Sequence, residues 1–234
     1  MIRMKEKFVP EYRGYLRNHL ITVPDIIHSC GGIRIFGKLI KSLVFSTDIA
    51  IIRNTNADAV IAVYPFTPQP IISHALIMSA DIPVFCGIGG GTTTGTRVLH
   101  LASDAEFQGA FGVVLNAPTA NTTIEGVRGV VDIPIVVTVV SEYDDIEARL
   151  KAGTTILNVS AAGKTPRLFE SIRNRFPDVP LIATGGPNDQ SIADTINAGA
   201  NAVTWTPPTN GEIFKDMMEK YRESSKHSAE TQGA

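Results

Sequence analysis

Residues 180–207 read PLIATGGPNDQSIADTINAGANAVTWTP, and this stretch decides the fold. An apolar run (LIAT) ends in two glycines, a segment with apolar residues at helical spacing follows, and a second apolar run (NAVTW) comes after it. Short apolar runs without period-two alternation are typical of strands covered on both faces, as in a parallel sheet. The stretch therefore predicts a strand, a helix and a second strand parallel to the first.

The same pattern recurs along the chain. Asp-Ile-Pro or Asp-Val-Pro precedes an apolar run at residues 81, 132 and 178, and NTNADAVIAVYP (54–65) echoes INAGANAVTWTP (196–207). An even strand–helix repeat of this kind predicts a single closed (β/α)8 TIM barrel. An open doubly wound sheet is the alternative, and the absence of any break in the repeat favours the barrel. The predicted strands lie near 42–46, 59–64, 82–87, 110–116, 133–140, 154–160, 180–185 and 201–206.

Two segments lie outside the repeat. Residues 1–40 are predicted to form an appendage, with a helix near 10–19 and extended pieces around residues 31–32 that plug the barrel floor. Residues 41–222 form the barrel, and the polar tail 223–234 is predicted to be disordered. Residues 1–41 hold eight basic and three acidic residues, although the whole chain has a net charge of −2. We interpret this basic arm as a solvated helix rather than a nucleic-acid-binding segment.

The composition is that of a globular protein, with 44% hydrophobic and 19% charged residues. No apolar run approaches the roughly 20 residues that span a membrane, and the basic first residues lead into no apolar signal segment. The two cysteines, Cys30 and Cys86, have no metal-binding spacing and are predicted to be reduced and unpaired. We therefore expect a cytoplasmic protein with no membrane partner; a homo-oligomer is left open.

The stretch at 180–207 resembles the last two units of phosphate-binding TIM barrels of the ribulose-phosphate-binding type. In that superfamily a strand ends in Gly-Gly, and a helix and a last strand follow. The resemblance implies a phosphate held by backbone N–H groups around Gly185 and Gly186. The chain departs from the pattern at Pro207 and Pro208, because proline has no N–H to donate; Thr206 and its neighbours would have to substitute.

Residues 86–96, CGIGGGTTTGT, invite comparison with nucleotide-binding loops. Neither the P-loop nor the dinucleotide fingerprint is complete, because the lysine of one and the third glycine of the other are missing. The loop follows the third predicted strand, on the face where barrel ligands bind. Glycines let a ligand approach the backbone, so we favour ligand contact over a simple turn. The residues concerned are Gly89, Gly90, Gly91 and Thr92.

Other strand ends supply hydroxyls and amides but few ionisable groups. Asn116 and Asn158 are candidate ligand-binding residues, and Glu142 is a candidate acid or base, unless it merely complements a helix dipole. Asp48 is a second candidate base, with a helix cap as the alternative interpretation. Lys164 stands at a predicted helix start, where its charge opposes the helix dipole, so a bound anion would explain it.

Several chemistries are disfavoured by the sequence. No predicted strand interior holds a lysine for a Schiff base, and the histidines form no zinc-binding pair, so we expect no metal. No cofactor is expected either, although FMN is a third option because flavin phosphates use the same Gly-Gly site.

Two functions from different classes remain. The first is an isomerase, epimerase or carbon–carbon lyase that acts on a small phosphorylated metabolite. The second is a non-catalytic regulatory barrel that senses such a ligand, as glycerol-uptake antiterminator proteins of the superfamily are thought to do. The fold favours the enzyme and the sparse acid–base inventory favours the sensor.

Overall fold

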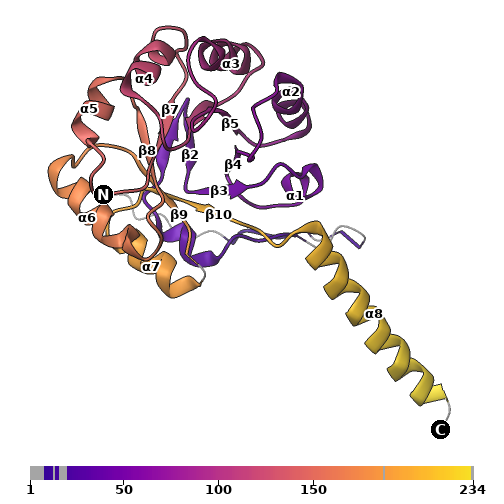
Figure 1. Ribbon diagram of the computed structural model, residues 1–234. Helices are drawn as coiled ribbons and strands as arrows, with labels where there is room; N and C mark the ends of the chain where they lie inside the picture. The colour runs from indigo at the N-terminus through magenta and orange to yellow at the C-terminus, as the bar shows by residue number, and fades with distance from the viewer. Residues whose placement is uncertain (1–7, 13, 16–19, 187, 233–234) are drawn as a thin grey trace.

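The structure, a computed structural model, describes residues 8–12, 14–15, 20–186 and 188–232, with the backbone alone for 224–232. Eight parallel strands close into a barrel, and helices surround it (Figure 1). The predicted TIM barrel is confirmed, and each observed strand overlaps its predicted range. The barrel strands are β3 (Ser42–Phe45), β4 (Ala59–Ala62), β5 (Val84–Gly89), β6 (Gly112–Leu115), β7 (Ile135–Val139), β8 (Ile156–Val159), β9 (Leu181–Thr184) and β10 (Ala202–Trp205).

Each strand is followed by a helix, as the repeat predicts. A short 3-10 helix, η2 (Ala162–Lys164), also precedes the sixth of these helices. Within the part of the chain that the structure describes, no helix is both long and apolar enough to cross a membrane. The helices are α1 (Ile49–Arg53), α2 (Pro70–Ser79), α3 (Thr96–Phe107), α4 (Asn121–Arg128), α5 (Ile146–Lys151), α6 (Thr165–Arg175), α7 (Asp189–Asn197) and α8 (Asn210–Gln232).

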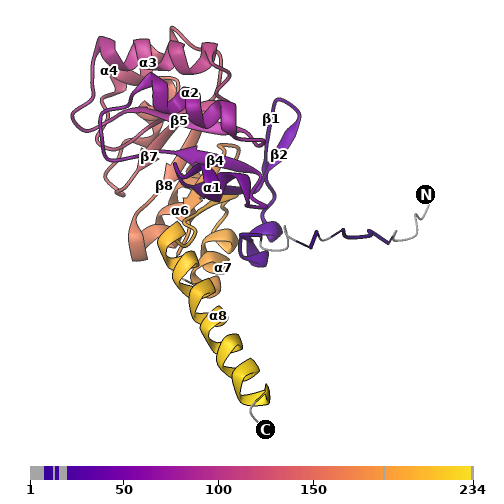
Figure 2. The same cartoon turned by 90° about the vertical axis from the view of Figure 1, so that its right-hand side faces the viewer.

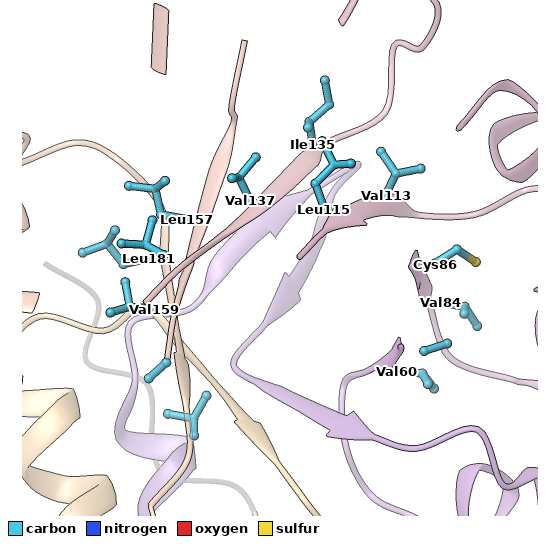
Figure 3. Close-up of a cluster of buried hydrophobic side chains, with 14 of the residues drawn as sticks. Val60, Val84, Cys86, Val113, Leu115, Ile135, Val137, Leu157, Val159 and Leu181 are labelled. Atoms are coloured by element: carbon cyan, nitrogen blue, oxygen red, sulfur yellow. The ribbon is translucent and has the colours of Figure 1, made fainter. Parts of the chain in front are cut away.

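The strands bury both of their faces, in two separate hydrophobic clusters. Outward-facing side chains such as Val113, Leu115 and Val137 pack beneath the helices (Figure 3). Inward-facing side chains, among them Phe85, Val114 and Val136, form the second cluster inside the barrel. Burial on both faces explains why these strands read as unbroken apolar runs in the sequence.

A hairpin closes the amino-terminal end of the barrel. Its strands β1 (Ile33–Ile35) and β2 (Lys38–Ile40) pair antiparallel, and their isoleucines join the interior cluster. At the hairpin tip the Phe36 ring meets the Phe111 ring edge-on, with 5.2 Å between centroids, and the Lys38 ammonium lies 5.6 Å from the Phe111 centroid. The interior is therefore sealed on this side, and ligands have access from the other.

The segment before the hairpin covers the outside of the barrel. The 3-10 helix η1 (Asp25–Ser29) packs against α7, and Ile27 is fully buried in the outer cluster. The Ile21 N–H donates to the Asn54 carbonyl at 2.7 Å, which ties this segment to the end of α1. Residues 8–12, 14 and 15 are not helical, so the helix predicted near 10–19 is not found there; its other residues lie outside the described part.

Helix α8 projects away from the barrel (Figures 1 and 2) and continues to Gln232. The prediction of a disordered tail from residue 223 therefore differs from the structure. The physical reason is local: residues 212–232 contain neither glycine nor proline, and Glu, Lys, Met and Ala are strong helix formers. Solvated helices and disordered segments are both polar, so the polar composition of this tail does not distinguish between them.

Candidate functional site

A row of polar side chains lies inside the carboxyl end of the barrel. Asn116, Thr138 and Asn158 each stand two residues after a member of the interior cluster, so strand alternation points them inward. The Thr138 hydroxyl donates to Asn116 Oδ1 at 3.3 Å, and Asn158 Nδ2 donates to Thr138 Oγ1 at 3.3 Å. We call these three residues the polar row. It runs across the three adjacent strand ends of β6, β7 and β8.

Two buried polar atoms at this end of the barrel have no partner. Asn158 Oδ1 and Thr204 Oγ1 form no hydrogen bond with any described residue, although the two residues are only 8% and 6% exposed. Thr204 follows the interior residue Ala202 by two positions on β10, so it shares the inward face. An unsatisfied buried polar group costs about 1–3 kcal/mol, and most native structures avoid it. Both atoms are therefore candidates for contact with a bound molecule.

The glycine loop after β5 borders a pocket of about 250 Å³ beside this row. Gly90 and Gly91 have φ values of 111° and 60°, which favour glycine, and a Cβ on Gly90 would collide with the backbone of Asn116. Helix α3 begins after Gly95 without a side-chain cap, so its first N–H groups have no side-chain acceptor. The structure thus brings together five residues that the sequence proposed for ligand contact: Gly89, Gly90, Gly91, Thr92 and Asn116.

The opposite wall of this pocket is apolar and aromatic. It consists of Val63, Tyr64, Pro65 and Phe66 from the loop after β4. The Tyr64 hydroxyl accepts a hydrogen bond from the Gln69 N–H at 2.8 Å, which fixes the shape of the loop. The pocket therefore combines an apolar wall with a wall of backbone and hydroxyl groups, as small-molecule sites commonly do.

Glu142 and Lys164 line one cavity of about 280 Å³, between the loop after β7 and the start of α6. Arg167 borders the same cavity, one helical turn beyond Lys164. All three side chains are exposed. Neither cation forms an ion pair with a side chain that the structure describes. The cavity thus offers a carboxylate and two unpaired cations, which suits acid–base chemistry next to a negatively charged group.

The predicted phosphate site at Gly185 and Gly186 makes close contacts within the protein. The Gly185 N–H donates to the Thr204 carbonyl at 2.7 Å, and Gly186 packs against Ser191. Asn188 Oδ1 accepts from the Ser191 N–H at 2.9 Å, which caps α7. These glycines line a third cavity, of about 530 Å³, whose acidic wall residue Asp194 would repel an anion.

The second half of the predicted phosphate site, at the start of α8, also forms hydrogen bonds within the protein. The Thr209 N–H donates to the Glu212 carboxylate at 2.8 Å, and the Glu212 N–H donates to Thr209 Oγ1 at 3.2 Å, at the start of α8. Thr206 is exposed and lines none of the three cavities. The Gly185 and Thr209 N–H groups are therefore already engaged within the protein. The glycine loop and Gly185–Gly186 border different cavities.

Asp48 has a structural role. Its Oδ1 accepts from the Ala50 N–H at 2.8 Å and caps α1, and its Oδ2 accepts from Asn210 Nδ2 at 2.6 Å. The alternative interpretation of this residue, as a helix cap, therefore accounts for its contacts. Both carboxylate oxygens are engaged, which leaves Glu142 as the better candidate base.

Both cysteines are free and buried. Cys86 belongs to the outer cluster, and burial raises the pKa of its thiol to about 11. This environment suits a structural side chain and not a nucleophile.

Groups of three or more metal-ligating side chains are not found within the described residues.

Thr138 is a residue of this site that was not predicted from the sequence. It lies within the apolar run IVVTVV, where a single threonine carries no motif. A usable signal was its position two residues after Val136, which the strand alternation turns to the same inward face as Asn116 and Asn158.

The comparisons with known proteins reveal similar folds only. No family model and no curated protein sequence matches the chain. A putative phosphonomutase from Burkholderia cenocepacia J2315 aligns with a TM-score of 0.59 and 16% identity, over 86% of this chain and 96% of that one. Phosphonopyruvate hydrolase, in complex with oxalate and Mg²⁺, gives 0.54 and 13%, over 80% and 81%. Thiamine phosphate pyrophosphorylase from Pyrococcus furiosus gives 0.53 and 16%, over 70% and 84%.

Proposed function

We propose that the protein is an enzyme that acts on a small polar metabolite bound at the carboxyl end of its barrel, as an isomerase, epimerase or carbon–carbon lyase. One observation carries this proposal: the polar row ends in a buried, unpaired amide oxygen of Asn158, and the unpaired Thr204 hydroxyl shares that end of the barrel. Unpaired buried polar atoms are costly, and Asn158 and Thr204 place two of them at the end of the barrel where the polar row lies, whereas the unpaired atoms of Gln108 and Thr154 stand apart from it.

Glu142 is the proposed acid–base residue. Its cavity begins at Val140, two residues after Thr138, so it lies next to the polar row along β7. Glu142 would take a proton from a carbon beside a carbonyl group, and the electron pair of that C–H bond would move toward the carbonyl oxygen. Lys164 would stabilise the resulting oxyanion, and return of the proton to carbon would complete an isomerisation or epimerisation.

A phosphorylated substrate would use the same two cations. Lys164 and Arg167 are better placed to hold a phosphate than Gly185 and Gly186, because both cations border one cavity without a salt-bridge partner among the described residues, whereas the Gly185 N–H is engaged within the protein and Asp194 borders that second cavity. The names of the structural neighbours also refer to phosphonate and phosphate compounds. This support is indirect, since the likeness to those proteins extends to the fold alone. We propose no cofactor.

A non-catalytic sensor is the second candidate function. The observation in its favour is that the glycine-loop pocket is lined by no acidic, basic or histidine side chain. Such a pocket can bind a ligand but offers little acid–base chemistry, so the two functions differ in whether Glu142 matters.

Turnover of a panel of small carbonyl compounds and sugar phosphates, followed by proton NMR in D₂O, separates the two functions. We expect deuterium to enter at the carbon beside a carbonyl in one or more compounds. Glu142→Gln should reduce this rate at least about 100-fold, the range typical of general acid–base catalysis. Glu147→Gln, an exposed glutamate on α5 that pairs with Lys151, is the matched control and should leave the rate unchanged. Equal rates in wild type and Glu142→Gln would contradict the proposed role.

A further inference from the structure

The hydrogen bonds of the polar row limit what its ligand can be. Thr138 stands between two amides and has one hydroxyl proton to donate. In the arrangement described above, that proton goes to Asn116 Oδ1, and Thr138 Oγ1 accepts from Asn158 Nδ2. Two amide atoms are then left without a hydrogen bond from the row: Asn116 Nδ2, a donor, and Asn158 Oδ1, an acceptor.

Reversing the direction of the hydrogen bonds in the polar row does not change the number of free donor and acceptor atoms. If both amides turn over, Asn116 Nδ2 donates to Thr138 and the Thr138 hydroxyl donates to Asn158 Oδ1. The free atoms are then Asn116 Oδ1 and Asn158 Nδ2. In either direction the row offers one donor at one end and one acceptor at the other. A molecule that presents an acceptor to one end and a donor to the other satisfies it, and compounds with several hydroxyl or amide groups carry both.

The other inward-facing side chains around the row are uncharged. The inward positions at the same end of the other strands include Phe45, Val63 and Gly87, and the remaining two are threonines, Thr184 and Thr204. None of these is charged, and Asn158 is more than nine-tenths buried. A carboxylate or phosphate placed here would lose its hydration without a cation to compensate.

We propose that the polar row binds an uncharged polyhydroxy or amide-bearing compound, or the uncharged part of a larger substrate, and rejects phosphate and carboxylate groups. The inference rests on the proposed function, because it specifies the ligand chemistry of that same site. It also assigns Thr138 as the residue that couples the two amides. Charged groups of a substrate are directed away from the row, to the cavity of Lys164 and Arg167.

The test uses ribose and ribitol as neutral probes and inorganic phosphate as the charged probe, with NMR signals of the Asn116 and Asn158 side-chain amides as the readout. We expect the neutral probes to shift both amide signals together in wild type, and phosphate at the same concentration to leave them in place. Thr138→Val keeps the side-chain shape but removes the hydroxyl, and should weaken binding at least tenfold. Thr154→Val is the matched control, because it also deletes a buried unpaired hydroxyl, but one that precedes β8 at the opposite end of the barrel.

The outcomes separate the two claims. Amide shifts with phosphate and none with ribose or ribitol would overturn the inference and leave a ligand site at the mouth. Binding of the neutral probes that is equally strong in Thr138→Val would also overturn it. If no probe at about 100 mM shifts either amide signal, the inference is overturned. The proposed function would still stand in that case if the turnover measured by deuterium exchange were abolished by Glu142→Gln.

Discussion

The two ends of the barrel interior differ in the chemistry of their inward-facing side chains. At the floor, Phe85 and Phe111 meet edge-on at 6.1 Å, and the hairpin seals them from water. At the mouth, the polar row and Thr204 face inward, and Asn158 and Thr204 are buried with unpaired polar atoms; at the floor end the Thr154 hydroxyl is also buried and unpaired among the described residues. The same strands form both ends. The difference between the ends therefore comes from which inward-facing residue each strand places near the floor and which it places near the mouth. Our proposal assigns stability of the fold to the apolar floor and ligand binding to the polar mouth.

The largest effect is expected at the floor. Phe85→Ala should lower the free energy of unfolding by about 3–5 kcal/mol, because it empties a fully buried ring site. Phe66→Ala at the mouth removes a ring that is 73% exposed and should cost less than about 0.5 kcal/mol. Urea denaturation of both variants makes the comparison. Similar losses from the two would show that the floor is not the main source of stability.

A backbone effect of intermediate size is expected in the glycine loop. Gly90→Ala should destabilise the protein by about 1–3 kcal/mol, since alanine is strained at a φ of 111° and its Cβ would meet the Asn116 backbone. Gly163→Ala is the control: nothing lies within 4 Å of its added Cβ, and its φ is not positive. Thermal melting should distinguish them. A neutral Gly90→Ala would mean that the loop is free to move away from Asn116.

A gain in stability is expected at the mouth. Thr204→Val should raise the free energy of unfolding by about 1 kcal/mol, because it replaces an unpaired buried hydroxyl by a methyl group of similar shape. The same variant should bind ligand more weakly than wild type. Calorimetric melting of the ligand-free protein checks the first part. A loss of stability would indicate that the hydroxyl already has a partner, such as an ordered water.

The smallest difference is expected between the reactivities of the two cysteine thiols toward a thiol reagent. Burial raises the pKa of Cys30 and of Cys86 to about 11, so at pH 8 only about one molecule in a thousand carries either thiolate. Both should resist a thiol reagent in the native protein and react fully after denaturation. As the pH rises from about 9 toward 11, the unfolded thiols ionise first and stability should fall. Rapid labelling of Cys86 alone at pH 8 would point to an opening near β5.

Much of the fold was predictable from the sequence because it depends on local patterns. Runs such as VFCGIG at 84–89 are buried on both faces and therefore lack alternation, and their even spacing permits few architectures. The tail beyond residue 223 was mispredicted because helix propensity and polarity give opposite indications there. No local rule states which of them prevails.

The site was predicted in part, and for a specific reason. Asn116, Asn158 and the glycine loop follow from the rule that barrel ligands bind at strand ends. Whether a backbone N–H group at a strand end is free to bind a ligand does not follow from this rule, because it depends on contacts between residues that are distant in the sequence. The Gly185 N–H is consumed by Thr204 on the next strand, and Gly186 is packed against Ser191. Only the assembled barrel reveals those contacts.

The most direct test of the central claim is a crystal structure of the protein equilibrated with a metabolite extract. The account predicts density for a small molecule at the carboxyl end of the barrel, within hydrogen-bonding distance of both Asn158 and Thr204, and its loss in Thr138→Val. Ordered waters that satisfy both atoms and that no component of the extract displaces would contradict it, as would a ligand bound only at Gly185 and Gly186.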